Sequence, residues 1–151
     1  MIFLAALIAT VYCSYTDIFY RRVPNLVVGV LLLLSCVEVL LYPARFSDIG
    51  YGLVFGLLIG FAFYVLKVWG AGDAKLFIAV SAIVGIFSFF KFFYFTLLAG
   101  GLLALGYILA HASQRRKGHA SILSHWLGAV KRDIPYGVAI SAGMVALKIF
   151  S

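Results

Sequence analysis

Two aspartates stand out among the five acidic residues of the chain, because both lie beside long apolar stretches. Asp17 comes four residues before Arg21, near the end of one apolar segment, and Asp73 follows a Gly-Ala-Gly sequence just before another. Ionisable residues at such positions are candidates for function, since burying a charge there is costly. Two carboxylates that meet in a partly dry pocket share one proton. One then takes a proton from water while the other polarises a carbonyl group, which is the chemistry of an aspartic protease.

A transporter is the alternative reading of the same residues, because paired membrane acids also bind cations or protons. Transporters usually carry such acids near the bilayer midplane, often within repeated halves. Asp17 and Asp73 are both expected at the cytoplasmic edge, and the sequence shows no internal repeat. A small cation- or proton-coupled transporter using Asp17 and Asp73 stays the second hypothesis. Glu38 is expected near the outer end of a span and Asp48 in an outer loop, and neither is expected to act in catalysis.

The composition places these aspartates in a membrane protein. Of the 151 residues, 65% are hydrophobic and 11% are charged, whereas a soluble domain carries about 25% charged residues. This nearly excludes a soluble enzyme and predicts a single membrane-embedded domain over residues 1–151, with no soluble insertion. The net charge of +7 comes without an aromatic-basic motif, so no nucleic acid is expected. The two cysteines form no CxxC pair, so neither a metal nor another cofactor is expected.

Apolar segments predict an all-α polytopic protein with six transmembrane helices, each of about 20 residues. Their approximate bounds are 2–20, 26–42, 49–66, 74–90, 92–111 and 134–150. Residues 121–130 carry apolar side chains at helical spacing and predict a short amphipathic helix at the lipid headgroups. Glycines that recur every four residues in the third segment predict close helix packing inside the bundle rather than a dimer interface: Gly52, Gly56 and Gly60.

Basic residues predict the orientation of these helices. With the N-terminus outside, nine of the twelve basic residues fall on inner loops and three on the outer side, namely Arg45, Lys91 and Lys148. Basic residues collect in cytoplasmic loops. Both termini are therefore expected outside the cytoplasmic (inner) membrane, with Asp17 and Asp73 at its cytoplasmic edge.

The interval between Lys75 and Lys91 is short for a span, so the fourth helix is expected to begin near Asp73. Lys75 then either extends towards water or tunes Asp73 electrostatically. Gly70 and Gly72 are expected to permit a tight backbone in front of Asp73. In the earlier break, Asn25 is expected to cap the second helix.

Three sequence motifs resemble those of one family. Residues 70–76 read Gly-Ala-Gly-Asp-Ala-Lys-Leu and resemble the GxGD-x-K-L signature of type IV prepilin peptidases, which are GxGD-type intramembrane aspartyl proteases. Ala74 is a small departure, since bulkier aliphatic residues are common there. Residues 17–25 resemble the family's first-aspartate motif, which runs from Asp through a basic stretch to Pro-Asn. Residues 134–137, Ile-Pro-Tyr-Gly, are similar to the Pro-Tyr-Gly that opens its last helix.

The resemblance implies an enzyme that removes the short basic leader of type IV prepilins or pseudopilins at the cytoplasmic face, typically after a glycine. It implies Asp17 and Asp73 as the catalytic pair. It further implies supporting roles for the other motif residues: Pro24, Asn25, Gly70, Gly72, Lys75, Pro135, Tyr136 and Gly137.

The short chain resembles the peptidase-only branch that serves Flp-type tight-adherence pili, because it lacks the cysteine tetrad and insertion of larger members. Archaeal preflagellin peptidases are related and stay open as an alternative. The expected partners are the prepilin substrate and membrane lipids, while the sequence does not indicate an oligomeric state.

Overall fold

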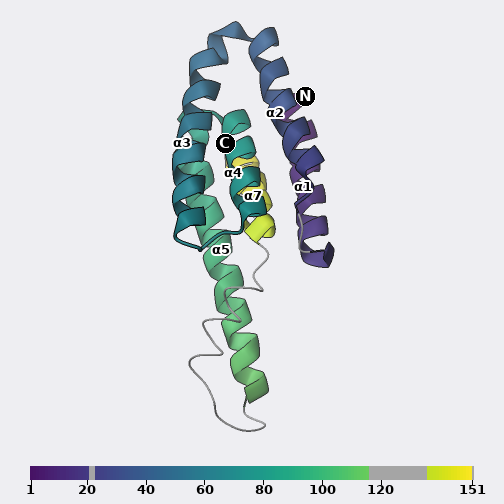
Figure 1. Ribbon diagram of the computed structural model, residues 1–151, viewed down its shortest axis with the longest axis vertical. Coiled ribbons are helices and arrows are strands. Elements are labelled where there is room, and N and C mark those ends of the chain that lie inside the picture. Colours follow the sequence, from purple (N-terminus) through teal and green to yellow (C-terminus); the bar gives the residue numbers. More distant parts are fainter. Residues whose placement is uncertain (21–22, 116–135, 151) are drawn as a thin grey trace.

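The computed structural model describes residues 1–20, 23–115 and 136–150, and this part of the chain is all-helical (Figure 1). A short 3₁₀ helix, η1 (Pro43–Arg45), joins the second and third α-helices. The α-helices are α1 (Ile2–Tyr20), α2 (Asn25–Leu41), α3 (Phe46–Val65), α4 (Ala71–Val84), α5 (Ile86–Arg115) and α7 (Tyr136–Ile149). Arg21, Arg22, Pro135 and the amphipathic helix predicted over residues 121–130 lie outside the described residues.

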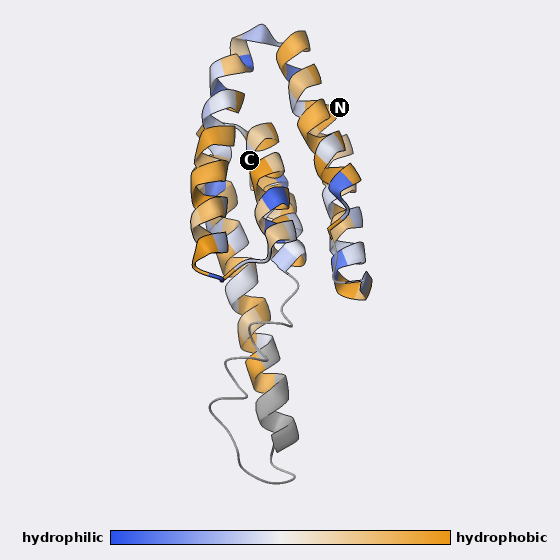
Figure 2. Cartoon of the chain, viewed as in Figure 1, coloured by the Kyte–Doolittle hydropathy of each residue, from blue (hydrophilic) through white to orange (hydrophobic). Residues whose placement is uncertain are grey.

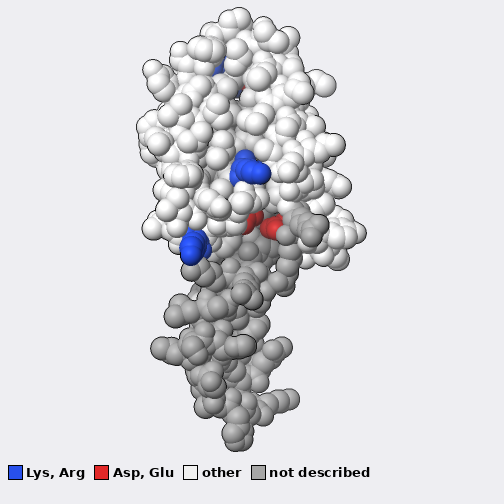
Figure 3. All heavy atoms as spheres, viewed as in Figure 1, with Lys and Arg blue, Asp and Glu red and all other residues white. Residues whose placement is uncertain are grey.

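The helices carry apolar side chains on their outward faces, as a membrane-spanning bundle requires. Within the described ranges, three helical stretches are long and apolar enough to cross a membrane: Ile2–Tyr20, Pro43–Val65 and Ile86–Gly106. Large side chains such as Leu4, Phe61 and Leu102 point away from the bundle. Figure 2 shows apolar residues over most of the helices, and the face drawn in Figure 3 has few charged side chains. The chain is therefore a multi-pass membrane protein, and the all-helical prediction is confirmed.

Helix packing places α4 and α7 among the longer helices. α3 packs along α4, while α7 packs along both α5 and α1. Phe77 of α4 is fully buried and stacks on Phe92 of α5, with ring centroids 5.3 Å apart. Because α1, α4 and α7 are mutual neighbours, residues at their ends can meet although they are far apart in the sequence.

The glycines of α3 make its close packing against α4 possible. A Cβ atom added at Gly52 would lie 2.6 Å from the Ser81 carbonyl oxygen and 2.9 Å from the Gly85 Cα atom. Gly60 faces Ile78 of α4 in the same way, at 3.1 Å. The predicted packing of these glycines inside the bundle is confirmed.

Gly52→Ala should destabilise the fold by about 1–3 kcal/mol, the usual range for overpacking a tight core. The atoms that the new methyl group would meet belong to backbone and cannot move aside cheaply. Gly50→Ala in the same helix is the matched control, because nothing lies within 4 Å of its added Cβ. The unfolding midpoint in a denaturing detergent measures both variants. Equal midpoints for Gly52→Ala and Gly50→Ala would contradict this packing.

The break between the fourth and fifth helices was predicted at the wrong residue. The sequence suggested helices over 74–90 and 92–111, but α4 ends at Val84 and α5 continues through Lys91. Gly85 separates them with a φ of 71°, a conformation that glycine adopts without a steric penalty. The Asp48 carboxylate occupies the space beside Gly85, and its Oδ1 accepts a hydrogen bond from the Phe87 amide at 3.1 Å. A contact with α3 therefore caps the beginning of α5, directly after the break at Gly85.

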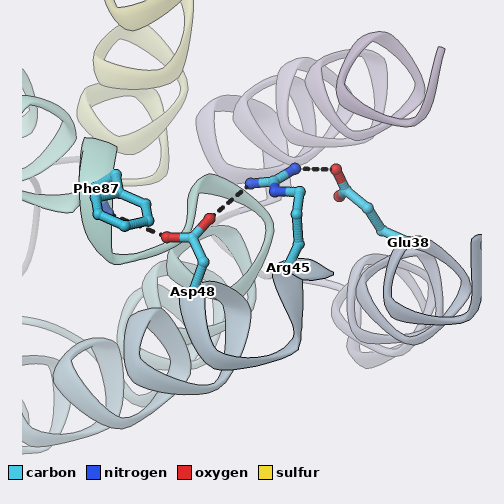
Figure 4. A network of polar contacts seen from close by, with 4 residues as sticks. All are labelled: Glu38, Arg45, Asp48 and Phe87. Carbon is cyan, nitrogen blue, oxygen red and sulfur yellow. Dashed lines mark hydrogen bonds and ion pairs between the residues drawn. The ribbon is translucent and has the colours of Figure 1, made fainter. Parts of the chain in front are cut away.

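The expectation that Asp48 lies in a loop was wrong as well, whereas Glu38 lies near the end of α2 as expected, and both residues are buried. Each is 8% exposed, and Asp48 lies in the first turn of α3 instead of a loop. Arg45 forms ion pairs with Glu38 and with Asp48, the second at 3.0 Å (Figure 4). This network ties the end of α2 to the beginnings of α3 and α5. One guanidinium group thus gives each of the two buried carboxylates an ion-pair partner.

Candidate active site

Asp17 lies in the last turn of α1 and is held by the first turn of α7. It is 8% exposed, and its Oδ2 atom accepts a hydrogen bond from the Gly137 amide at 2.9 Å. The first amides of a helix have no partner within the helix and attract negative groups. A Cβ atom at Gly137 would lie 2.8 Å from Asp17 Oδ2 and 3.2 Å from its Cβ. Only glycine leaves room for this contact.

Asp73 lies at the beginning of α4 and caps that helix. Its Oδ2 atom accepts a hydrogen bond from the Gly70 amide at 3.3 Å. The helix was expected to begin at residue 74, but it begins at Ala71, so Asp73 belongs to its first turn. An acidic side chain in this position stabilises the orphan amides of the helix. Helix capping and the electrostatics of the helix end thus fix the Asp73 carboxylate at the surface of the bundle.

Gly70 and Gly72 leave room for neighbouring side chains and do not adopt an unusual backbone conformation. Gly70 has an ordinary extended conformation, with φ −72° and ψ 160°. An added Cβ would lie 3.3 Å from Asp73 Oδ2 at Gly70 and 3.2 Å from the Val23 side chain at Gly72. A side chain at Gly70 would crowd the carboxylate, and one at Gly72 would push α4 away from the segment that follows α1.

The two carboxylates converge on the beginning of α7. Asp17 and Asp73 are close enough to interact electrostatically, and the Gly137 amide that donates to Asp17 also lies near Asp73. The hydroxyl group of Tyr136 lies within electrostatic reach of Asp73. The structure thus brings together two acids from α1 and α4 with two residues of the third motif. Such an arrangement can activate a water molecule on one carboxylate and polarise a carbonyl group with the other.

Hydroxyl groups that the sequence analysis did not identify join α1 to α7 beside Asp17. The Ser14 and Ser141 Oγ atoms are 2.5 Å apart, and Ser14 Oγ also lies 3.2 Å from the Gly137 carbonyl oxygen. Ser141 Oγ donates to the Thr10 carbonyl oxygen at 2.7 Å. Thr10, Ser14 and Asp17 recur at helical spacing on one face of an apolar helix, and that polar stripe was the available signal. The stripe fixes the distance between Asp17 and the Gly137 amide.

Within the described ranges, no hydrogen bond or ion pair joins Lys75, Pro24 or Asn25 to the Asp73 carboxylate. The Lys75 side chain is exposed and forms no ion pair with a described carboxylate, which favours an extension towards water over tuning of Asp73. Asn25 is the first residue of α2, and Pro24 occupies the cap position in its place. The prediction that Asn25 caps α2 was therefore wrong by one residue. Pro24 and Asn25 begin α2 next to Val23, which contacts Gly72.

The model of the type IV leader peptidase family matches residues 3–109. That range is most of the chain and includes Asp17, Asp73 and the glycines beside it, but it ends before Tyr136 and Gly137. No curated protein and no solved structure matches the chain.

Proposed function

The chain belongs to the type IV leader peptidase family, and we propose that Asp17 and Asp73 are the catalytic pair of this aspartic-type prepilin leader peptidase. The observation that carries the proposal is that the Asp17 carboxylate of α1, which accepts a hydrogen bond from the Gly137 amide, lies within electrostatic reach of the Asp73 carboxylate of α4. No other pair of described acidic residues combines family motifs with a position at this end of the bundle. Glu38 and Asp48 instead share Arg45 as their ion-pair partner.

The proposed reaction is hydrolysis of the peptide bond that joins the leader to the mature pilin. One carboxylate takes a proton from water, and the resulting hydroxide attacks the scissile carbonyl carbon. The other carboxyl group, protonated, donates a hydrogen bond to the carbonyl oxygen as negative charge develops there. Collapse of the tetrahedral intermediate breaks the C–N bond, and the amine leaves with a proton from the pair. The Gly137 amide and the Ser14–Ser141 contact hold Asp17 in place throughout.

The proposed topology has six spans, formed by α1 to α5 and α7, with both termini outside and the active site at the cytoplasmic edge. The distribution of basic residues supports it. We also propose that residues 121–130 form an amphipathic helix on the cytoplasmic side and that residues 1–151 form a single peptidase domain. Cysteine labelling at Ser47 and Ser113, with Cys13 and Cys36 replaced, should label Ser47 from the outside and Ser113 from the inside. Labelling of Ser113 from the outside would contradict this topology.

The proposed substrate is a type IV prepilin or pseudopilin with a short basic leader that ends in glycine. The family to which the chain belongs implies leader cleavage. The chain has only two cysteines, which supports a place in the peptidase-only branch similar to the enzymes of Flp pili. The nine basic residues assigned to the cytoplasmic side serve orientation and contact with anionic lipids in this proposal.

Coexpression with a prepilin tests the function and separates it from cation or proton transport. A peptidase should convert the prepilin to a shorter form in cells that contain this chain, and an Asp73→Asn variant should leave it at full length. Vesicles containing the purified protein should show no cation- or proton-driven uptake. Unprocessed prepilin together with a cation flux that depends on Asp73 would overturn the proposal in favour of a transporter.

A further inference from the structure

An apolar pocket of about 250 Å³ lies between α5, α7 and the segment that joins α3 to α4. Both helices line it with residues three and four apart, so each turns one face towards it. The α7 face includes Tyr136 and Ile140. The α5 face is formed mainly by small residues, which leave the space open: Leu97, Gly100, Gly101 and Ala104.

The pocket adjoins both of the motifs that surround the aspartate pair. Trp69 forms part of its wall and directly precedes the Gly-Ala-Gly sequence in front of Asp73. Tyr136 forms another part, and its hydroxyl group lies within electrostatic reach of Asp73. The next residue, Gly137, donates its amide hydrogen to Asp17. A peptide bond held at the two carboxylates would therefore have a neighbouring side chain close to the pocket.

The wall of the pocket suits a large apolar side chain. The described wall residues include no charged side chain, and the hydroxyl group of Thr96 among them is itself buried. The rings of Phe63 and Trp69 stack on each other in the wall, with centroids 4.6 Å apart. An apolar cavity of about 150 Å³ is enough to bind benzene. The pocket therefore has room for a phenyl ring or a branched aliphatic group.

The chemistry of the substrate decides which side of the scissile bond can supply this group. The leader in the proposed reaction is basic and ends in glycine. Glycine has no side chain to bind, and a basic side chain would lose its hydration against a wall without an opposite charge. The apolar group must then come from the mature pilin.

We propose that this pocket binds the first large apolar side chain after the scissile bond and so helps to place that bond at Asp17 and Asp73. This inference rests on the proposed function and names a specificity site for it. Tyr136 would connect the two, because it lines the pocket and lies near Asp73.

A change in the substrate gives the first test. Replacing the first large apolar residue after the bond by alanine should lower kcat/KM of the wild-type enzyme by about 10- to 100-fold, the effect of losing one buried apolar side chain. The measurement is cleavage of the two purified prepilins by the full-length enzyme in detergent.

A change in the pocket gives the second test. Nothing lies within 4 Å of a Cβ atom added at Gly101, so Gly101→Leu can fill the pocket without a clash at its first atom. This variant should lower kcat/KM for the unmodified prepilin by about tenfold or more. It should cause little further loss with the alanine-substituted prepilin, because two changes that remove the same contact are not additive.

Gly106→Leu is the matched control, because Gly106 lies on the same helix, has equally open space and does not line the pocket. It should cleave both prepilins at wild-type rates. If Gly101→Leu fails to fold, Ala104→Leu takes its place, since Ala104 lies on the same face of α5.

Two results would overturn the inference while leaving the proposed function intact. Unchanged cleavage of the unmodified prepilin by a folded Gly101→Leu protein would show that the pocket holds no substrate group and is open to a lipid chain instead. Equal losses with both prepilins would show general damage to the enzyme. If the wild-type enzyme cleaved neither prepilin, the proposed function would fail, and the specificity site with it.

Discussion

Asp17→Asn and Asp73→Asn should each lower the rate of leader removal by about 10²- to 10⁴-fold or more, the range that general acid–base groups contribute. The double variant should be no slower than either single variant. If the two carboxylates share one proton and activate one water molecule, loss of either one already disables the unit, and such residues are non-additive. The measurement is kcat/KM for cleavage of a prepilin in detergent or vesicles.

Asp48→Asn provides the control for these variants. Asp48 lies in the network with Arg45 and Phe87, away from the first turn of α7. Loss of its ion pair should lower the unfolding midpoint while the folded protein keeps its cleavage rate. Asp17→Asn and Asp73→Asn should remain folded, since asparagine keeps the shape and lowers the penalty for burial. Additive losses from Asp17→Asn and Asp73→Asn would show that the two residues act separately.

Gly137→Ala should lower kcat by about 10²-fold, the effect of a displacement of about 1 Å at a catalytic group. The new methyl group would sit 2.8 Å from Asp17 Oδ2, so either the Asp17 carboxylate or the end of α7 must move. The hydrogen bond from the Gly137 amide to Asp17 would lengthen or break. KM should change little, because the substitution acts on Asp17 and not on the substrate.

Gly29→Ala is the matched control for this substitution. Nothing lies within 4 Å of an added Cβ at Gly29, which is exposed on α2. It should leave both kcat and the unfolding midpoint nearly unchanged. Wild-type kcat in a folded Gly137→Ala protein would show that the Gly137 contact does not position Asp17.

The presence of the helices could be predicted from the sequence, because it depends on the local pattern of apolar residues. Long apolar segments indicate helices that cross a bilayer, and the structure has a helix in each of the six predicted segments. The glycine spacing of α3 likewise predicted which face packs inside the bundle. The motifs around Asp17 and Asp73 could be recognised for the same reason, since each is a continuous stretch of sequence.

The break at Gly85 could not be predicted, since it depends on a contact between elements that are distant in the sequence. Lys91 is the only charged residue in this region and predicts the boundary there, but the Asp48 carboxylate fills the space beside Gly85 and accepts a hydrogen bond from the Phe87 amide. The burial of Glu38 was not predicted either, although its partner Arg45 is only seven residues away. The ion pair between Glu38 and Arg45 forms because η1 turns the chain at the end of α2.

The candidate site was only partly accessible from the sequence for a related reason. The motifs named Asp17, Asp73 and Gly137, but no local pattern indicates that the amide of Gly137 donates to Asp17. That contact arises because α7 packs along α1. The same packing brings Ser141 to Ser14, and neither serine belongs to a motif.

The most direct test of hydrolysis by the aspartate pair is the mass of the products formed from a prepilin in heavy-oxygen water. Attack by an activated water molecule should give a leader fragment with one heavy oxygen in its new carboxylate and an unlabelled mature pilin with a free amine. Both products should form at least about 10²-fold more slowly with the Asp17→Asn and Asp73→Asn variants. An unlabelled leader, an uncut prepilin with the folded wild-type protein, or labelled products formed at the wild-type rate by a folded Asp73→Asn variant would contradict catalysis by Asp17 and Asp73.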